Sequence, residues 1–163
     1  MSGDRAVLRW QCGSAEEVGL TGVYAALQLR AEVFVVEQRC AYADVDGRDL
    51  AKGVRHLLAW QEATLVACAR LLPPGLAFDS AAIGRVAVAF SARGQGLAHA
   101  LMYRAIEQCE LAWSDADIML GAQAHLQRFY AAHGFAPCSE PYLEDGIPHI
   151  DMRRVRQDKE RRL

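Results

Sequence analysis

The chain has 163 residues and a mass of 17.9 kDa, the size of one folded domain. Hydrophobic residues make up 52% of the sequence and charged residues 23%, which excludes the composition of a disordered chain. The 18 lysines and arginines nearly balance the 20 aspartates and glutamates, so a net charge of -2 gives no overall basic field that would attract nucleic acid or an anionic membrane.

The N-terminal residues show no export signal. Met1–Arg5 is polar and runs into Ala6–Trp10 without an apolar core or a cleavage site of small residues. Arg70 and Arg85 interrupt the most apolar stretches, so no uninterrupted apolar run reaches the roughly 18 residues of a membrane span. The five cysteines include no Cys-x-x-Cys pair, which is typical of reduced thiols and not of a zinc or redox centre. We therefore expect a cytoplasmic protein without a metal site or a membrane span.

The first third of the chain predicts a strand, a helix and a loop. Ala6–Cys12 has a short β pattern. The Ser-x-x-Glu pattern at Ser14 and Thr21 are alternative helix starts, and apolar residues recur at helical spacing from Thr21 to about Glu37. The following stretch, Cys40–Gly53, is acidic and rich in turn residues, so a loop is expected there.

The middle of the chain predicts three strands and a long helix. The runs His56–Trp60 and Thr64–Leu72 are separated by a length that suits a hairpin, and Pro73–Gly75 ends the second strand. A β-branched run, Ile83–Phe90, is the third strand. After a glycine-rich turn, apolar residues from Leu97 to Trp113 follow helical spacing.

The last third adds a strand, a helix and a hairpin. These are expected at Asp117–Gly121, Ala124–His133 and Tyr142–Met152, with Gly134 ending the helix. The strands and helices therefore alternate as in an α/β fold. We expect a single domain over residues 1–154 and a charged tail, 155–163, that frays in solvent.

The turn between the third strand and the long helix has the features of an anion site. Free N–H groups and the positive end of the helix dipole meet at Arg93–Ala98. Gly94 and Gly96 leave room for a diphosphate, and Arg93 adds a charge, although a plain connection between strand and helix often uses glycine as well. His99 stands where a Rossmann fingerprint needs a small residue, and no Gly-Lys-Ser/Thr sequence of a P-loop is present.

Two ordered motifs resemble signatures of the GCN5-related N-acetyltransferase (GNAT) superfamily. The segment that leads from Val86–Val88 to Arg93–Ala98 resembles its acyl-CoA pyrophosphate motif, and Phe129–Phe135 resembles its Tyr-x-x-x-Gly-Phe signature. The likeness covers roughly residues 6–154 and implies a mixed, mostly antiparallel sheet flanked by helices. Further stretches that resemble the ElaA branch of the superfamily are Leu29–Gln38, Gly121–Leu126 and Glu144–His149.

The resemblance implies acetyl-CoA as the co-substrate and assigns its contacts by position. Val86 and Val88 would present main-chain groups to the pantetheine, and Gln123 stands where many members bind the pantetheine with an asparagine. Tyr130 falls on the frequent general acid, which protonates the CoA thiolate. Neither a metal nor a covalent enzyme intermediate is required. The pyrophosphate would be held by Arg93, Gly94, Gln95, Gly96, Leu97 and Ala98.

The general base is open between several residues. Glu37 lies at the end of the first long helix, where the superfamily builds its acceptor site, and His56 and His149 lie on strands that could flank that site. Each also has a structural interpretation, as a solvated helix end or as a histidine satisfied within a strand. The acidic turn residues could attract a cationic amine, but charge in a turn is usually solvated. They are Asp44, Asp46 and Asp49.

We therefore expect direct acetyl transfer to the amine of a small molecule or a protein, without nucleic acid or membrane as a partner. A homodimer is compatible with the sequence. One alternative is an acyl-homoserine-lactone synthase, which Arg30–Phe34 and the acidic turn faintly resemble, although the chain is shorter than such enzymes usually are. Another is a catalytically silent acyl-CoA sensor, against which Tyr130 argues.

Overall fold

The computed structural model describes residues 7–157, which form two compact units. The N-terminal unit contains Met1–Arg70 and Arg85–Met102, and the C-terminal unit contains Leu71–Gly84 and Tyr103–Leu163. Strands β3 (Thr64–Leu72) and β4 (Ala81–Val88) contribute residues to both units, as does helix α2 (Leu97–Ala112). The expected start of the first strand at Ala6 and the end of the tail, residues 158–163, lie outside the described residues.

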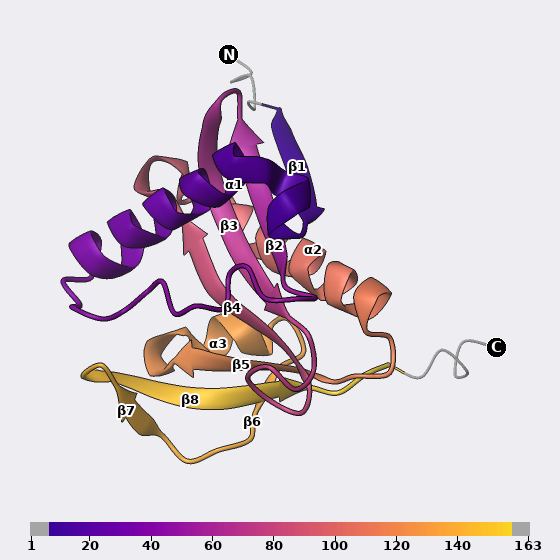
Figure 1. Ribbon diagram of the computed structural model, residues 1–163. Helices are drawn as coiled ribbons and strands as arrows, with labels where there is room; N and C mark the ends of the chain where they lie inside the picture. The colour runs from indigo at the N-terminus through magenta and orange to yellow at the C-terminus, as the bar shows by residue number, and fades with distance from the viewer. Residues whose placement is uncertain (1–6, 158–163) are drawn as a thin grey trace. The chain divides into compact units, whose positions relative to one another are not determined.

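In the N-terminal unit the strands follow the order β1-β2-β3-β4. β1 and β2 are antiparallel, with Leu8 opposite Gln61 and Gly13 opposite His56. Figure 1 shows the indigo helix α1 crossing the β1, β2 and β3 strands of this unit. All of the strands agree with the predicted ones to within a few residues. The further elements of the unit are β1 (Leu8–Gly13), α1 (Ala15–Arg30), the π-helix η1 (Ala31–Glu37), β2 (Arg55–Gln61) and the short 3-10 helix η2 (Phe90–Ala92).

Of the two helix starts that the sequence offers, the one at Ser14 is confirmed by a complete capping box. Glu17 N–H donates to Ser14 Oγ over 3.2 Å, and Ser14 N–H donates to Glu17 Oε1 over 3.0 Å. Two N–H groups at the helix start that have no carbonyl partner within the helix are therefore hydrogen-bonded. The helical segment ends at Glu37 as predicted, but its last seven residues are a π-helix, and Gly19, with a φ of 73°, kinks its beginning. Spacing of apolar residues does not distinguish these local departures from a regular α-helix.

The segment Ala15–Glu37 is long and apolar enough to cross a membrane, although charged residues interrupt its apolar run. A single such segment near the N-terminus is weak evidence for a span, and 33% of its most apolar window is buried in the protein. Val18, Ala26, Leu29 and Val33 pack in a core with residues of β2 and β3, among them Leu58. This packing accounts for the apolar residues on one face of the segment, whereas Leu20, Tyr24 and Val36 are exposed.

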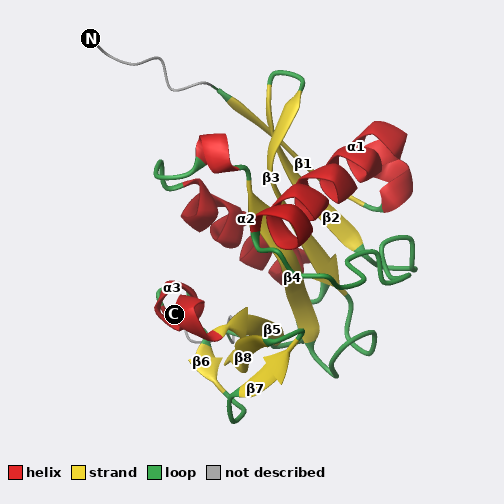
Figure 2. Ribbon diagram, turned by 90° about the vertical axis from the view of Figure 1, so that its left-hand side faces the viewer, coloured by secondary structure: helices red, strands yellow, loops and turns green. Residues whose placement is uncertain are grey.

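In the C-terminal unit the order is β4-β5-β8-β6, and β7 pairs with β8. β4 and β5 are parallel, whereas β8 is antiparallel to β5, β6 and β7. Figure 2 shows β7 and β8 as a hairpin beside β5. The mixed, mostly antiparallel α/β fold is therefore as predicted. The strands that belong to this unit alone are β5 (Ile118–Gln123), β6 (Ala136–Pro137), β7 (Tyr142–Glu144) and β8 (Ile147–Arg154).

Two details of the C-terminal unit differ from the sequence-based prediction. The expected helix Ala124–His133 is split into a 3-10 turn, η3 (Ala124–Leu126), and the short helix α3 (Gln127–Ala131). Gly134 ends it in the left-handed conformation, with a φ of 85°, as predicted. Strand β8 continues to Arg154, and the N–H of Arg156 donates to Asp117 Oδ1 over 2.8 Å, so the first residues of the charged tail are tied to this unit.

Candidate functional site

The glycine turn between β4 and α2 has the geometry that an anion site requires. Gly94 and Gly96 have φ values of 80° and 76°, in the left-handed region that favours glycine. A Cβ atom added to either would meet no heavy atom within 4 Å, so the space beside the main chain is open. Helix α2 begins at Leu97, and Ala100 N–H donates to Gly96 O over 3.1 Å. Main-chain N–H groups at the start of a helix have no carbonyl partner within that helix, and this end of α2 directly follows the open turn.

Arg93, expected to add charge for a phosphate, is held by other groups of the N-terminal unit. Its Nη1 and Nη2 form a two-pronged ion pair with the Glu37 carboxylate, with 2.7 Å between Nη2 and Oε2. Its Nε and Nη2 also donate to Val88 O over 3.1 and 3.0 Å. Arg93 therefore ties the end of η1 to the end of β4. The carbonyl of Val88, one of the groups expected to face pantetheine, is engaged in this contact.

The same ion pair weakens the case for Glu37 as the general base. The hydrogen bonds from Arg93 lower the pKa of the Glu37 carboxyl, because they stabilise its charged form. A carboxylate of lowered pKa that is bonded through both oxygens is a poor proton acceptor. Glu37 is thus neither a free base nor a merely solvated helix end. It lines a groove of about 320 Å³ with Leu29, Glu32, Val33, Ala89 and Phe90.

The two histidine candidates have different surroundings. His56 is 2% exposed, and its Nε2 lies 2.8 Å from Asp49 O, so it is a buried histidine satisfied by the main chain. His149 on β8 has its Nδ1 2.7 Å from Ile147 O. Since a carbonyl can only accept, Nδ1 carries the proton in that bond, and Nε2 is left as the nitrogen that can take up a second one.

His149 belongs to a row of polar side chains on the β5, β7 and β8 strands. Its ring stacks on Tyr142 with 5.9 Å between centroids, and its Nε2 is 3.6 Å from Glu144 Oε2. The Tyr142 hydroxyl donates to Asp151 Oδ1 over 2.6 Å. Gln123, the expected pantetheine contact, is the cross-strand partner of His149. The structure thus brings together two sequence-predicted site residues, Gln123 and His149, on adjacent strands of the C-terminal unit.

Tyr130 lies on α3 and is 8% exposed. Its ring packs edge-on against Phe129 and Phe135, with centroid separations of 5.0 and 6.3 Å. Burial raises the pKa of the phenol to about 12, so the hydroxyl keeps its proton at neutral pH. A buried, protonated phenol fits both a proton donor and a core residue.

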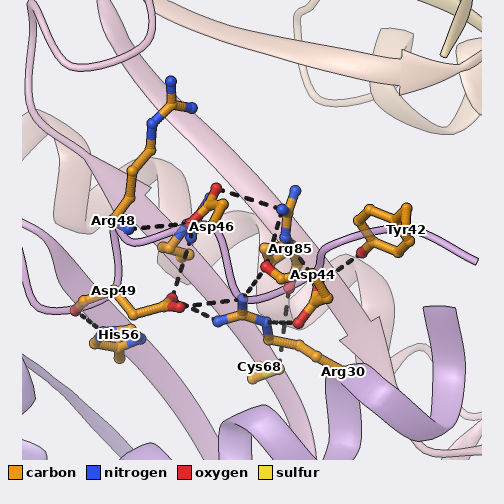
Figure 3. Close-up of polar contacts among 10 residues, drawn as sticks. Arg30, Tyr42, Asp44, Asp46, Arg48, Asp49, His56, Cys68 and Arg85 are labelled. Carbon is orange, nitrogen blue, oxygen red and sulfur yellow. Dashed lines mark hydrogen bonds and ion pairs between the residues drawn. The ribbon is translucent and has the colours of Figure 1, made fainter. Parts of the chain in front are cut away.

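Two of the three aspartates of the acidic turn are buried, contrary to the expectation that the turn is solvated. Asp44 and Asp49 are 7% and 6% exposed, and Figure 3 shows their carboxylates facing arginines from other elements. Arg30 Nε is 2.9 Å from Asp44 Oδ2, and Arg30 Nη1 is 2.6 Å from Asp49 Oδ1. We call this group the arginine–aspartate cluster. Its members are Arg30, Arg70, Arg85, Asp44, Asp46 and Asp49.

The cluster makes the stability of the fold sensitive to acid. Hydrogen bonds from Arg70 lower the pKa of Asp46. Burial raises the pKa of Asp49, but the hydrogen bonds and charges of Arg30 and Arg70 together outweigh it, so this pKa is lowered as well. Carboxyls with lowered folded-state pKa values stabilise the protein above their unfolded pKa of about 3.9, and this stabilisation is lost as the pH falls through the folded values. The free energy of unfolding is therefore expected to fall below about pH 4, as measured by urea titration at a series of pH values.

Asp46→Asn should flatten this acid dependence, because it removes one of the titrating groups. The matched control is Asp79→Asn at an exposed aspartate outside the cluster, which should keep the wild-type profile. If Asp46→Asn retains the full acid dependence, the cluster is not its source.

Comparison with known proteins agrees with this architecture. A family model described as the acetyltransferase (GNAT) domain matches residues 15–156. The chain is 47% identical over 148 residues to Protein ElaA of Escherichia coli, covering 91% of this chain and 97% of ElaA. The crystal structure of that protein superposes with a TM-score of 0.86, at 46% identity over 91% of this chain and 100% of the other.

Two further solved structures share the fold. An acyl-CoA N-acyltransferase from Pseudomonas aeruginosa is 50% identical, with a TM-score of 0.88, over 91% of this chain and 100% of the other. The AHL synthase LasI covers 91% of this chain and 89% of its own, with a TM-score of 0.69 but only 17% identity, so it shares the fold alone. Matched over most of its length by the family model and by ElaA, the chain belongs to the GNAT family of N-acetyltransferases.

Proposed function

We propose that this protein transfers the acetyl group of acetyl-CoA directly to the amine of a small molecule or a protein. The observation that carries this proposal is the open glycine turn, with Gly94 and Gly96 left-handed, between the strand β4 and the helix α2. Main-chain N–H groups at such a turn suit a pyrophosphate. The likeness to an acyl-CoA N-acyltransferase supports acyl-CoA as the donor. We propose a cytoplasmic location and one catalytic domain over residues 1–154.

The proposed reaction needs a base, an oxyanion donor and an acid. His149 Nε2 takes the proton from the ammonium of the acceptor, directly or through water, and the amine then attacks the thioester carbon. A main-chain N–H at the end of β4 stabilises the oxyanion that forms. The C–S bond breaks as the amide is completed, and the departing thiolate takes the proton of Tyr130. The second proton that the nitrogen loses returns to the Tyr130 oxygen through water, and His149 releases its proton to solvent. The five cysteines have no part in this sequence of steps.

Contacts to the donor are assigned to the turn and the strand. The pyrophosphate would accept from main-chain N–H groups between Gly94 and Ala98, and Gln95 and Leu97 belong to the same turn. Val86 and Val88 would face the pantetheine. Val88 would contact it through its N–H, because its carbonyl oxygen already accepts hydrogen bonds from Arg93. Arg93 would add positive charge near the pyrophosphate while it stays paired with Glu37. Gln123 would bind the pantetheine arm through its amide.

The proposal is tested by binding and turnover. CoA and acetyl-CoA should each raise the Tm, because a ligand at about 100 times its Kd stabilises the folded state by about 2.7 kcal/mol. Acetyl-CoA should then be consumed with some members of a panel of amines and peptides, measured as release of free CoA thiol. Saturating CoA with neither a thermal shift nor a calorimetric signal would remove the proposed function.

Two alternatives give different results in the same assays. A silent sensor would bind acetyl-CoA without consuming it in the presence of any acceptor. An acyl-homoserine-lactone synthase would release CoA thiol only with S-adenosylmethionine and a longer acyl chain. Acetyl-CoA turnover with a simple amine excludes both.

A further inference from the structure

Arg85 has an unusual main-chain conformation inside strand β4. Its φ is 50°, in the left-handed region that a residue with a large side chain adopts only at a cost in free energy. The residue lies directly before Val86, Ala87 and Val88, the part of β4 that ends at the Arg93 contact. A left-handed residue inside a strand redirects the main chain that follows it. The direction of Val86–Val88 therefore depends on how Arg85 is held.

The side chain of Arg85 is held by the acidic loop. Its Nε lies 2.9 Å from Asp44 Oδ1 as an ion pair, and its Nη2 donates to Asp44 O over 3.1 Å. Asp46 Oδ2 is 3.4 Å from the same Nη2. The guanidinium also lies over the ring of Tyr42, at 5.4 Å from the centroid. Figure 3 shows these groups converging on Arg85 from one loop.

The loop is itself fixed to other elements. Arg30 of α1 binds Asp44 through both the carboxylate and the main-chain oxygen, over 2.9 and 3.0 Å. Arg70 of β3 binds both oxygens of Asp46 over 2.8 Å each. Arg85 is therefore attached to a frame that is anchored on both a helix and a neighbouring strand.

The charges of the arginine–aspartate cluster neutralise one another within the protein. Three arginines face three aspartates, so the cluster has no excess negative charge with which to attract a cationic amine. The carboxylates that the sequence offered for substrate attraction are instead bound to arginines. Of the three arginines, Arg85 is the one that directly precedes Val86–Val88 in β4.

We propose that Arg85 is a positioning residue that sets the main chain of Val86–Val88 for the pantetheine arm of acyl-CoA. This inference rests on the proposed function. A strained conformation persists where the surroundings determine it, and here Asp44, Asp46 and Tyr42 do so. The loop at residues 42–46 thus acts on the donor without touching it.

The test compares two ligands on two variants. Arg85→Gly keeps a residue that adopts the left-handed conformation easily but removes the anchor. Calorimetry is done with CoA and with its phosphoadenosine diphosphate half, which has no pantetheine arm. For Arg85→Gly the Kd of CoA should rise about tenfold or more, roughly the loss of one hydrogen bond at the strand, while the Kd of the nucleotide half stays within about twofold.

Arg154→Gln is the matched control, since Arg154 has a side-chain exposure of 19%, close to the 24% of Arg85, and also binds a carboxylate and a main-chain oxygen, but lies in β8 outside the cluster. It should lower the Tm but leave the Kd of CoA within about twofold of wild type. If Arg85→Gly does not fold, Arg85→Lys is used in its place, since lysine keeps the charge but has only one nitrogen to bond.

The outcomes separate this inference from the proposed function. Wild-type protein that binds neither ligand contradicts the proposed function. Wild-type protein that binds CoA, with an unchanged Kd in the Arg85 variant, overturns the positioning role alone. Equal weakening of both ligands, or equal weakening of CoA by Arg154→Gln, also overturns it, because the effect would then be a general loss of structure.

Discussion

Replacing Gly96 by valine is expected to abolish CoA binding. The position has a φ of 76°, and the space into which a side chain would extend is open to at least 4 Å. A branched side chain would fill the space that a pyrophosphate needs to reach the main-chain N–H groups of the turn. Calorimetry should show no heat with CoA, and the Tm should no longer respond to the ligand.

The same substitution also strains the backbone, so a matched control is needed. Gly75, between β3 and β4, has a φ of 93° and equally open space around it, but it lies outside the glycine turn. Gly75→Val should lower the Tm by a similar amount and still bind CoA with the wild-type Kd. Wild-type affinity in Gly96→Val would place the phosphates elsewhere.

Replacing Tyr130 by phenylalanine is expected to lower kcat by about 10²–10⁴, the usual contribution of a general acid. The change keeps the ring and its contacts with Phe129 and Phe135 and removes only the hydroxyl. A thiolate is a fairly good leaving group without protonation, so the low end of this range is expected. The Kd of CoA and the Tm should change little.

The control for this variant is Tyr103→Phe, which removes a phenol that is 66% exposed on α2. It should keep the wild-type kcat. An unchanged kcat in Tyr130→Phe, together with a Tm several degrees lower, would assign Tyr130 to the hydrophobic core and leave the thiolate to be protonated by another group.

Local signals were enough to predict most of the fold. Three features depend on only a few neighbouring residues, and all three are found where they were expected. They are the capping box at Ser14, the glycine turn and the helix that begins at Leu97. Strand β6 was missed because Ala136–Pro137 is too short to have a pattern. The helix around Tyr130 was predicted too long because its first turn is a 3-10 turn.

The contacts that define the candidate site could not be read from local patterns. Glu37 and Arg93 are 56 residues apart, and Asp44 and Arg85 are 41 apart. A pattern that extends over a few residues cannot reveal contacts between residues so far apart in the sequence. The acidic turn was expected to be solvated because charged residues in a turn usually are, and the arginines that bind it lie in other elements. A signal was present in Arg70, which stands in the buried strand β3 and therefore needs a carboxylate partner.

Acetyl transfer itself is measured most directly with acetyl-CoA that carries an isotopic label in its acetyl group. We expect the label to appear on the amine of the acceptor, mole for mole with the CoA thiol that is released, and none to remain on the protein. Label that stays on CoA with every acceptor, although CoA binds at the turn, would contradict an acetyltransferase. Label recovered on a cysteine of the enzyme would contradict direct transfer.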